Sequence, residues 1–86
     1  MAVAISFTDA KPEVLAYLTE RLRTAAGLKE RRLAQAIEQL ERDEVLGALG
    51  ALRYEKRLLS VRVEEKEKLD QWIVCLYAYH HNLHET

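Results

Sequence analysis

Residues 49–63, LGALRYEKRLLSVRV, decide the fold, because two structures suit this stretch. In the first, residues 49–54 and 58–63 form a β-hairpin, since apolar and polar side chains alternate well in the second run. The turn at residues 55–57 contains no Gly, Asn or Asp, which tight hairpin turns favour. A helix that continues through this stretch to the C-terminus is therefore the alternative. The hairpin predicts a mainly α fold with a small β-hairpin (α+β), and the alternative predicts an all-α helical bundle.

On the N-terminal side of this stretch, the spacing of apolar residues predicts two helices. The first is expected over residues 12–26, where Pro12 suits the first turn and Gly27 suits the position that follows the last turn. The second is expected over residues 29–42. It is expected to end there because the helical spacing of the apolar residues breaks at residues 43–44. Residues 1–9 contain Val, Ile and Phe in alternation with small residues, which predicts a short strand or an ordered arm.

On the C-terminal side, residues 64–84 predict a terminal helix, with an acidic start and apolar residues at helical spacing. The stretch 72–79, WIVCLYAY, is apolar all round such a helix, so both faces need cover. We expect one face to pack on the domain and the other on a second copy in a two-fold dimer. A helix buried within the monomer is the alternative. The expected dimer interface consists of Trp72, Ile73, Leu76, Tyr77, Tyr79, His80 and Leu83.

Length and composition indicate one folded domain, residues 1–86. The chain has 13 Lys and Arg against 14 Asp and Glu, a formal net charge of −1, so a nucleic-acid partner has to be argued from local charge. The single cysteine, Cys75, excludes an intramolecular disulfide and predicts a cytoplasmic protein. No apolar stretch approaches the roughly 20 residues that cross a membrane, so no membrane association is expected.

No motif in the sequence predicts an enzyme or a cofactor. A glycine-rich phosphate loop, a nucleophile elbow and zinc-ligand spacings are all absent from the sequence. Cys75 lies among apolar neighbours, as expected for a small buried thiol. His80 and His84 lie four residues apart and are weak candidates for a metal site, but histidines near a helix C-terminus also interact favourably with its dipole. We predict no metal site.

Residues 14–46, VLAYLTERLRTAAGLKERRLAQAIEQLERDEVL, and residues 51–72, ALRYEKRLLSVRVEEKEKLDQW, together resemble the winged helix-turn-helix module of PadR-like or MarR-like transcription regulators. The resemblance implies a winged-helix-like fold in which residues 29–42 are the recognition helix and residues 49–63 are the wing. It also implies double-stranded DNA as partner. The residues implied to contact DNA are Lys29, Arg31, Arg32 and Gln35 on the recognition helix and Arg53, Lys56 and Arg57 on the wing.

Local charge supports this expectation, because residues 53–62 contain four cations and one acid. The alternative for residues 29–42 is a solvated helix face with internal pairs such as Glu38 with Arg42. The function we expect is that of a non-enzymatic, dimeric DNA-binding transcription regulator. The alternative function is a small protein-binding adaptor or inhibitor, of phage or accessory type, that places the apolar surface of residues 72–79 on a larger protein.

Overall fold

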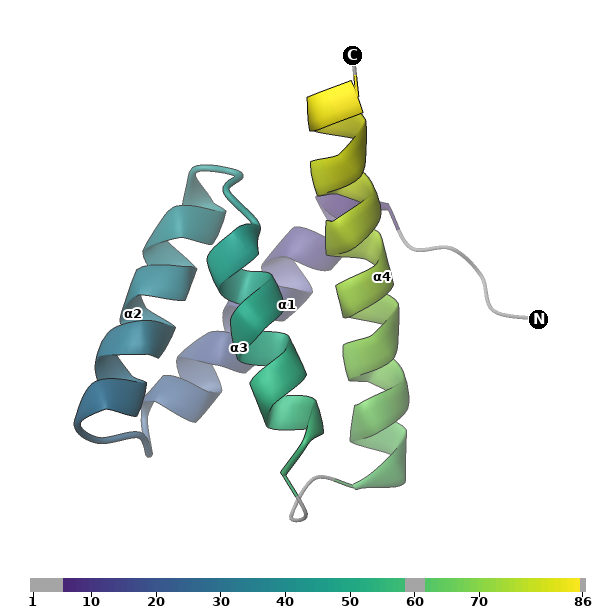
Figure 1. Ribbon diagram of the computed structural model, residues 1–86. Helices are drawn as coiled ribbons and strands as arrows, with labels where there is room; N and C mark the ends of the chain where they lie inside the picture. The colour runs from purple at the N-terminus through teal and green to yellow at the C-terminus, as the bar shows by residue number, and fades with distance from the viewer. Residues whose placement is uncertain (1–5, 59–61, 86) are drawn as a thin grey trace.

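The computed structural model describes residues 6–58 and 62–85, and in these residues it contains helices and no strand (Figure 1). The winged-helix-like α+β fold is therefore wrong, and the chain has the all-helical alternative. The helices in chain order are α1 Phe7–Leu22, α2 Leu28–Glu41, α3 Leu46–Lys56 and α4 Val63–Glu85.

Helix α1 begins five residues before the predicted start at residue 12, because Ser6 caps it. The Ser6 hydroxyl accepts a hydrogen bond from the Asp9 backbone N–H at 3.2 Å. Pro12 therefore lies inside the helix, and the helix ends at Leu22, four residues before the predicted end. The predicted strand or arm over residues 1–9 is wrong for residues 7–9, which are helical, and residues 1–5 lie outside the described part of the chain.

The turn between α2 and α3 is a Schellman motif, which ends α2 within one residue of the predicted end. The Glu44 N–H donates to the Gln39 carbonyl at 2.9 Å, and the Asp43 N–H donates to the Leu40 carbonyl at 2.9 Å. Asp43 has a φ of 63°, in the left-handed region that usually favours glycine. Because of this turn, α3 runs back antiparallel beside α2 (Figure 1).

The predicted wing, residues 49–63, is mostly helix α3 and the start of α4. Its apolar residues fit a helix better than a strand, because Ala48, Leu49 and Leu52 lie at helical spacing and are all buried on one side. A strand would send Leu49 and Leu52 to opposite faces, where one of them would lose this burial. Residues 59–61, on which the second strand depended, lie outside the described part of the chain.

Helices α2, α3 and α4 lie side by side in alternating directions, and α1 crosses behind them (Figure 1). All four helices contribute to one core. Its members are Ala10, Val14 and Leu18 from α1, Leu33, Ala36 and Leu40 from α2, Val45 directly before α3, Ala48, Leu49 and Leu52 from α3, and Leu69, Trp72 and Leu76 from α4. Each fully buried leucine contributes about 2 kcal/mol through burial of apolar surface. This core orients the outer sides of α2, α3 and α4 toward solvent.

Helix α4 matches the predicted terminal helix, residues 64–84, to within one residue at each end. In the described residues, no helix has the length and apolar character that crossing a membrane requires.

Candidate functional site

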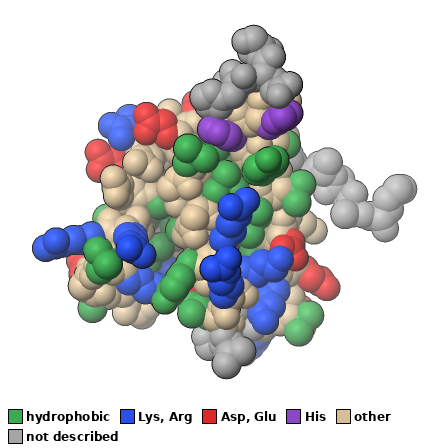
Figure 2. Space-filling view, viewed as in Figure 1, with side chains coloured by type: hydrophobic (Ala, Val, Ile, Leu, Met, Phe, Trp, Pro, Cys, Tyr) green, Lys and Arg blue, Asp and Glu red, His purple; other side chains and the backbone are tan. Residues whose placement is uncertain are grey.

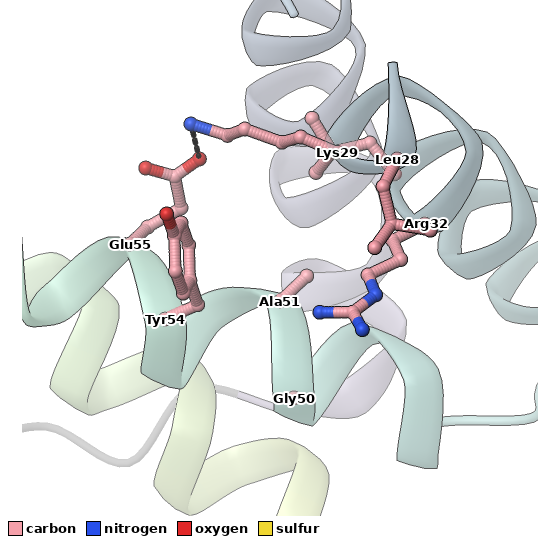
Figure 3. Close-up of a pocket in the computed structure, with 8 residues that line it drawn as sticks. Leu28, Lys29, Arg32, Gly50, Ala51, Tyr54 and Glu55 are labelled. Carbon is pink, nitrogen blue, oxygen red and sulfur yellow. Dashed lines mark ion pairs between the residues drawn. The ribbon is translucent and has the colours of Figure 1, made fainter. Parts of the chain in front are cut away.

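Lys and Arg side chains gather over α3 and the neighbouring parts of α2 and α4 (Figure 2). Arg53 and Arg57 lie four residues apart at the end of α3 and are both exposed, so they share one side of the helix. Arg32 of α2 extends toward Gly50 and Ala51 of α3 (Figure 3). We call Arg32, Arg53 and Arg57 the arginine face. None of the three has an ion-pair partner among the described residues.

The two lysines predicted to contact DNA are engaged within the protein. The Lys29 ammonium lies 3.5 Å from the Glu55 carboxylate, and Lys56 forms an ion pair with Asp70 of α4. Both lysines are partly exposed, so either can exchange its partner for a phosphate at the cost of the existing pair. The arginines are therefore better placed than the lysines to bind an added anion.

The two remaining residues predicted to contact DNA, Arg31 and Gln35, lie on the outer side of α2. Both are exposed, and they are four residues apart on one side of the helix. Arg31 is displaced by about 100° round α2 from Arg32, so it points away from α3. Like the arginine face, Arg31 has no ion pair within the described part of the chain. The structure thus divides the predicted contacts between the α2–α3 surface and the outer edge of α2.

A buried carboxylate, Glu55, joins three helices below this surface. Its side chain is 0% exposed, and its Oε2 accepts a hydrogen bond from Arg21 of α1 at 2.9 Å. This hydrogen bond is the main reason why the pKa of the Arg21 guanidinium is raised. The other oxygen, Oε1, faces Lys29 of α2 but has no hydrogen-bond partner in the described residues. The only acidic side chain on this part of α3 is thus turned inward and paired, which leaves the outer surface cationic.

A pocket of about 300 Å³ opens between α2 and α3 beside the arginine face. In Figure 3, Lys29 reaches over Tyr54 toward Glu55 at one end of the pocket, and Arg32 lies at the other end. The Lys29 ammonium lies 5.4 Å from the centre of the Tyr54 ring, which places a cation over an aromatic face. The lining residues are Leu28, Lys29, Arg32, Leu33, Gly50, Ala51, Tyr54 and Glu55. The pocket is therefore apolar along its length and charged at both ends.

A second polar cluster lies between α1 and α4 and has a structural role. Trp72 donates its indole N–H to Glu13 at 3.2 Å, and Lys68 lies 3.0 Å from the same carboxylate. Hydrogen bonds from Lys68 and Trp72 lower the pKa of Glu13. Tyr17 packs on Trp72 with ring centres 5.3 Å apart, and burial raises its pKa. The cluster supplies the polar partner that a buried tryptophan needs.

The residues predicted for the dimer interface divide between the core and the surface of α4. Trp72 and Leu76 are buried in the monomer core, whereas Tyr77 is 54% exposed. Tyr79 is half-buried and stacks on Phe7 of α1 with ring centres 3.8 Å apart. Ile73 and His80 are half-buried as well, and the side chain of Leu83 lies outside the described residues. Trp72 and Leu76 are thus covered within the monomer, as the alternative to the dimer predicts.

The Cys75 thiol and the histidines of α4 are the remaining candidate reactive or metal-binding groups. Burial raises the pKa of the half-buried Cys75, which reduces its thiolate fraction at neutral pH. No group of three His, Cys, Asp or Glu side chains within residues 6–58 and 62–82 is placed to hold a metal ion. The His84 side chain lies outside these residues, so its pairing with His80 stays untested.

The contact between Arg21 and Glu55 was not predicted from the sequence, in which Glu55 is expected in the turn of the hairpin. A signal for the burial of Glu55 exists in the sequence, because Leu49 and Leu52 predict that residue 55 lies on the apolar side of a helix. No comparable signal identifies Arg21 as its partner, because the two residues are 34 positions apart in the chain.

Comparison with known proteins yields no relative for this chain: no family model, no curated protein and no solved structure matches it.

Proposed function

We propose that this chain is a non-enzymatic nucleic-acid-binding protein that holds double-stranded DNA against the arginine face. The observation that supports the proposal best is the free state of Arg32, Arg53 and Arg57, which have no ion-pair partner among the described residues. Free guanidinium groups on one surface suit phosphate oxygens, which they bind with two parallel hydrogen bonds.

The distribution of charge supports a phosphate partner, although the formal net charge is −1. Three exposed acidic side chains lie away from the arginine face: Glu38 is in the last turn of α2, and Asp43 and Glu44 follow that helix. Two of them already pair with Arg42 there, at 3.9 Å and 3.6 Å. A surface with separated charges orients an approaching polyanion even when the total charge is near zero.

The arrangement of the helices suggests which residues contact bases and which contact phosphates. Helix α3 lies between α2 and α4 (Figure 1), and Arg53 and Arg57 at its C-terminal end are exposed. Such a surface suits backbone phosphates, which position a protein on DNA without reading its sequence. Helix α2 lies at the edge of the layer (Figure 1), and its Arg31 and Gln35 side chains are exposed. Under this proposal, Arg31 and Gln35 reach the major groove from α2.

Salt dependence tests the proposal. If the arginine face neutralises three phosphates, log Kd changes with log salt with a slope of about 2.7, so raising salt from about 50 to 200 mM weakens binding about 40-fold. We would measure this by fluorescence anisotropy with a random-sequence duplex. The variant Arg53→Ala/Arg57→Ala should lower the slope by about 1.8.

The matched control removes Arg42, a cation at the C-terminal end of α2, away from the arginine face. Arg42→Ala loses a charge that already pairs with Glu38 and Glu44, so it should leave the slope unchanged. No binding at low salt, or equal effects of the Arg42 variant and of the Arg53→Ala/Arg57→Ala variant on the slope, would refute the proposal.

We also propose, as the second candidate, that α4 docks on another protein or on a second copy of the chain. Val74 and Tyr77 are 67% and 54% exposed, three residues apart on one side of the helix. Light scattering of the wild type and of Val74→Glu tests this proposal. A monomeric wild type that captures no partner would argue against it.

A further inference from the structure

We propose that the pocket between α2 and α3 binds a purine nucleotide, with the base at the Glu55 end and the phosphate at the Arg32 end. This inference deepens the proposed function, because it names the nucleic-acid component that the basic surface recognises. Two ligands present such a nucleoside monophosphate: a free nucleotide and the unpaired terminal nucleotide of a strand.

The carboxylate of Glu55 sets the orientation of the ligand. Glu55 lines the pocket and is 0% exposed, and its Oε1 has no hydrogen-bond partner among the described residues, with the Lys29 ammonium 3.5 Å away. A buried acceptor of this kind needs a donor, and a phosphate at this end would be repelled. A ligand N–H group that reaches Oε1 supplies the hydrogen bond that Lys29, at 3.5 Å, does not make.

The pair of Lys29 and Glu55 matches the edge of a purine base. The Lys29 ammonium, a donor, lies 3.5 Å from Glu55 Oε1, an acceptor. Guanine presents its O6 acceptor beside its N1–H donor, and adenine presents its N1 acceptor beside its N6 amino donor. Either base can thus accept from Lys29 and donate to Glu55 at the same time. Thymine and cytosine present a similar pair of groups, so the preference for a purine comes from stacking on Tyr54.

The rest of the pocket suits a planar base that carries an anion. Tyr54 is 52% exposed and forms an aromatic wall next to Glu55, and aromatic side chains stack with unpaired bases. Leu28, Leu33 and Ala51 provide apolar cover. At the other end, Arg32 has no ion-pair partner in the described chain and extends along the pocket toward α3 (Figure 3). The volume of about 300 Å³ is that of a small-ligand site.

Titration of the full chain with mononucleotides, followed by amide NMR shifts, tests the inference. We expect dGMP and dAMP to shift the amides of Gly50 and Ala51, and deoxyribose 5-phosphate and inorganic phosphate to leave them unchanged. dTMP should bind at least about fivefold more weakly, because a smaller ring stacks less on Tyr54.

Two exposed positions provide variants that do not disturb the core. Tyr54→Leu and Arg32→Ala should each weaken dGMP binding at least about fivefold. Arg42→Ala, the matched charge control on α2, should bind dGMP like the wild type. Equal affinity of the wild type and both pocket variants for dGMP, or equal shifts with deoxyribose 5-phosphate, would overturn the inference.

Two further titrations of the same sample, with a single strand and with a duplex, are informative. The first distinguishes a strand end from a free nucleotide as the ligand, and the second distinguishes the nucleotide pocket from the proposed duplex binding. Tighter binding of a single-stranded oligothymidine that ends in dG than of dGMP identifies a strand end as the ligand, and the reverse order identifies the free nucleotide; both support the pocket. Salt-dependent duplex binding without any dGMP shift at Gly50 and Ala51 refutes the nucleotide pocket alone. Absence of both signals refutes the pocket and the proposed function together.

Discussion

Replacement of Arg21 by methionine should destabilise the protein strongly, although Arg21 lies near the surface. The substitution keeps most of the apolar stem and removes the guanidinium that donates to Glu55 at 2.9 Å. The Glu55 carboxylate, 0% exposed, is then left with Lys29 alone, at 3.5 Å and without a hydrogen bond. A buried charge that loses its partner cannot recover its hydration, so the folded state loses free energy.

The magnitude follows from the geometry of the pair. Breaking a fully buried ion pair costs about 3–5 kcal/mol. The Arg21 side chain is 31% exposed and Lys29 stays nearby, so we expect a smaller loss of about 2–3 kcal/mol. For a domain of this size, such a loss lowers Tm by about 10–20 °C.

The assay is urea unfolding followed by circular dichroism, with Arg23→Met as the matched control. Arg23 pairs with Glu20 at 3.1 Å, but both side chains are about 70% exposed, so its replacement should cost less than about 0.5 kcal/mol. The double variant Arg21→Met/Glu55→Leu removes the buried charge as well and should recover most of the stability. Equal effects of the Arg21 and Arg23 variants, or additive effects of the Arg21 and Glu55 substitutions, would refute the reasoning.

Three further predictions concern the turn, the α1–α4 cluster and the thiol. Asp43→Ala should cost about 1 kcal/mol more than Asp43→Gly in urea unfolding, because φ is 63° and both variants lose the same surface ion pair; equal costs would contradict this. Trp72→Phe should raise the pKa of Glu13 in a carboxyl NMR titration, since hydrogen bonds from Lys68 and Trp72 lower it. The folded pKa of Glu13 lies below its unfolded pKa, so the stabilisation that its ionised form provides is present at neutral pH and is lost as pH falls through the folded pKa. An unchanged pKa of Glu13 in the Trp72→Phe variant would argue against this. Cys75 should react with an aromatic disulfide more slowly in the folded chain than in urea, because burial raises its pKa; equal rates would contradict that cause.

The helices that carry their own amphipathic pattern were predictable from the sequence. The prediction of 29–42 for α2 and 64–84 for α4 differs from the structure by one residue at each end. In both cases the apolar spacing is regular, and α4 also begins with acids that suit a helix N-terminus. The start of α1 differs from the prediction because the preference of Pro12 for a first turn predicts a start at residue 12, whereas the cap of Ser6 allows the helix to begin at Phe7.

Residues 49–63 were ambiguous because their local pattern suits both a strand and a helix. Only the packing of α3 between α2 and α4 buries Leu49, Leu52 and Glu55 on one side, and this burial favours the helix. Burial of Glu55 in turn requires the guanidinium of Arg21, which is distant in the chain. A local pattern contains no information about such a partner.

The sequence by itself determined that the chain is rich in helix, that α2 ends before Asp43, and that its basic residues lie on the segments that became α2 and α3. Only the tertiary structure decided which of those basic residues are available for a ligand. Lys29 and Lys56 are occupied by Glu55 and Asp70, whereas the arginine face has no ion-pair partner in the described chain. The physical reason is that helical periodicity places a side chain on a face of its own helix, while the charge of that face depends on the groups that neighbouring helices bring to it.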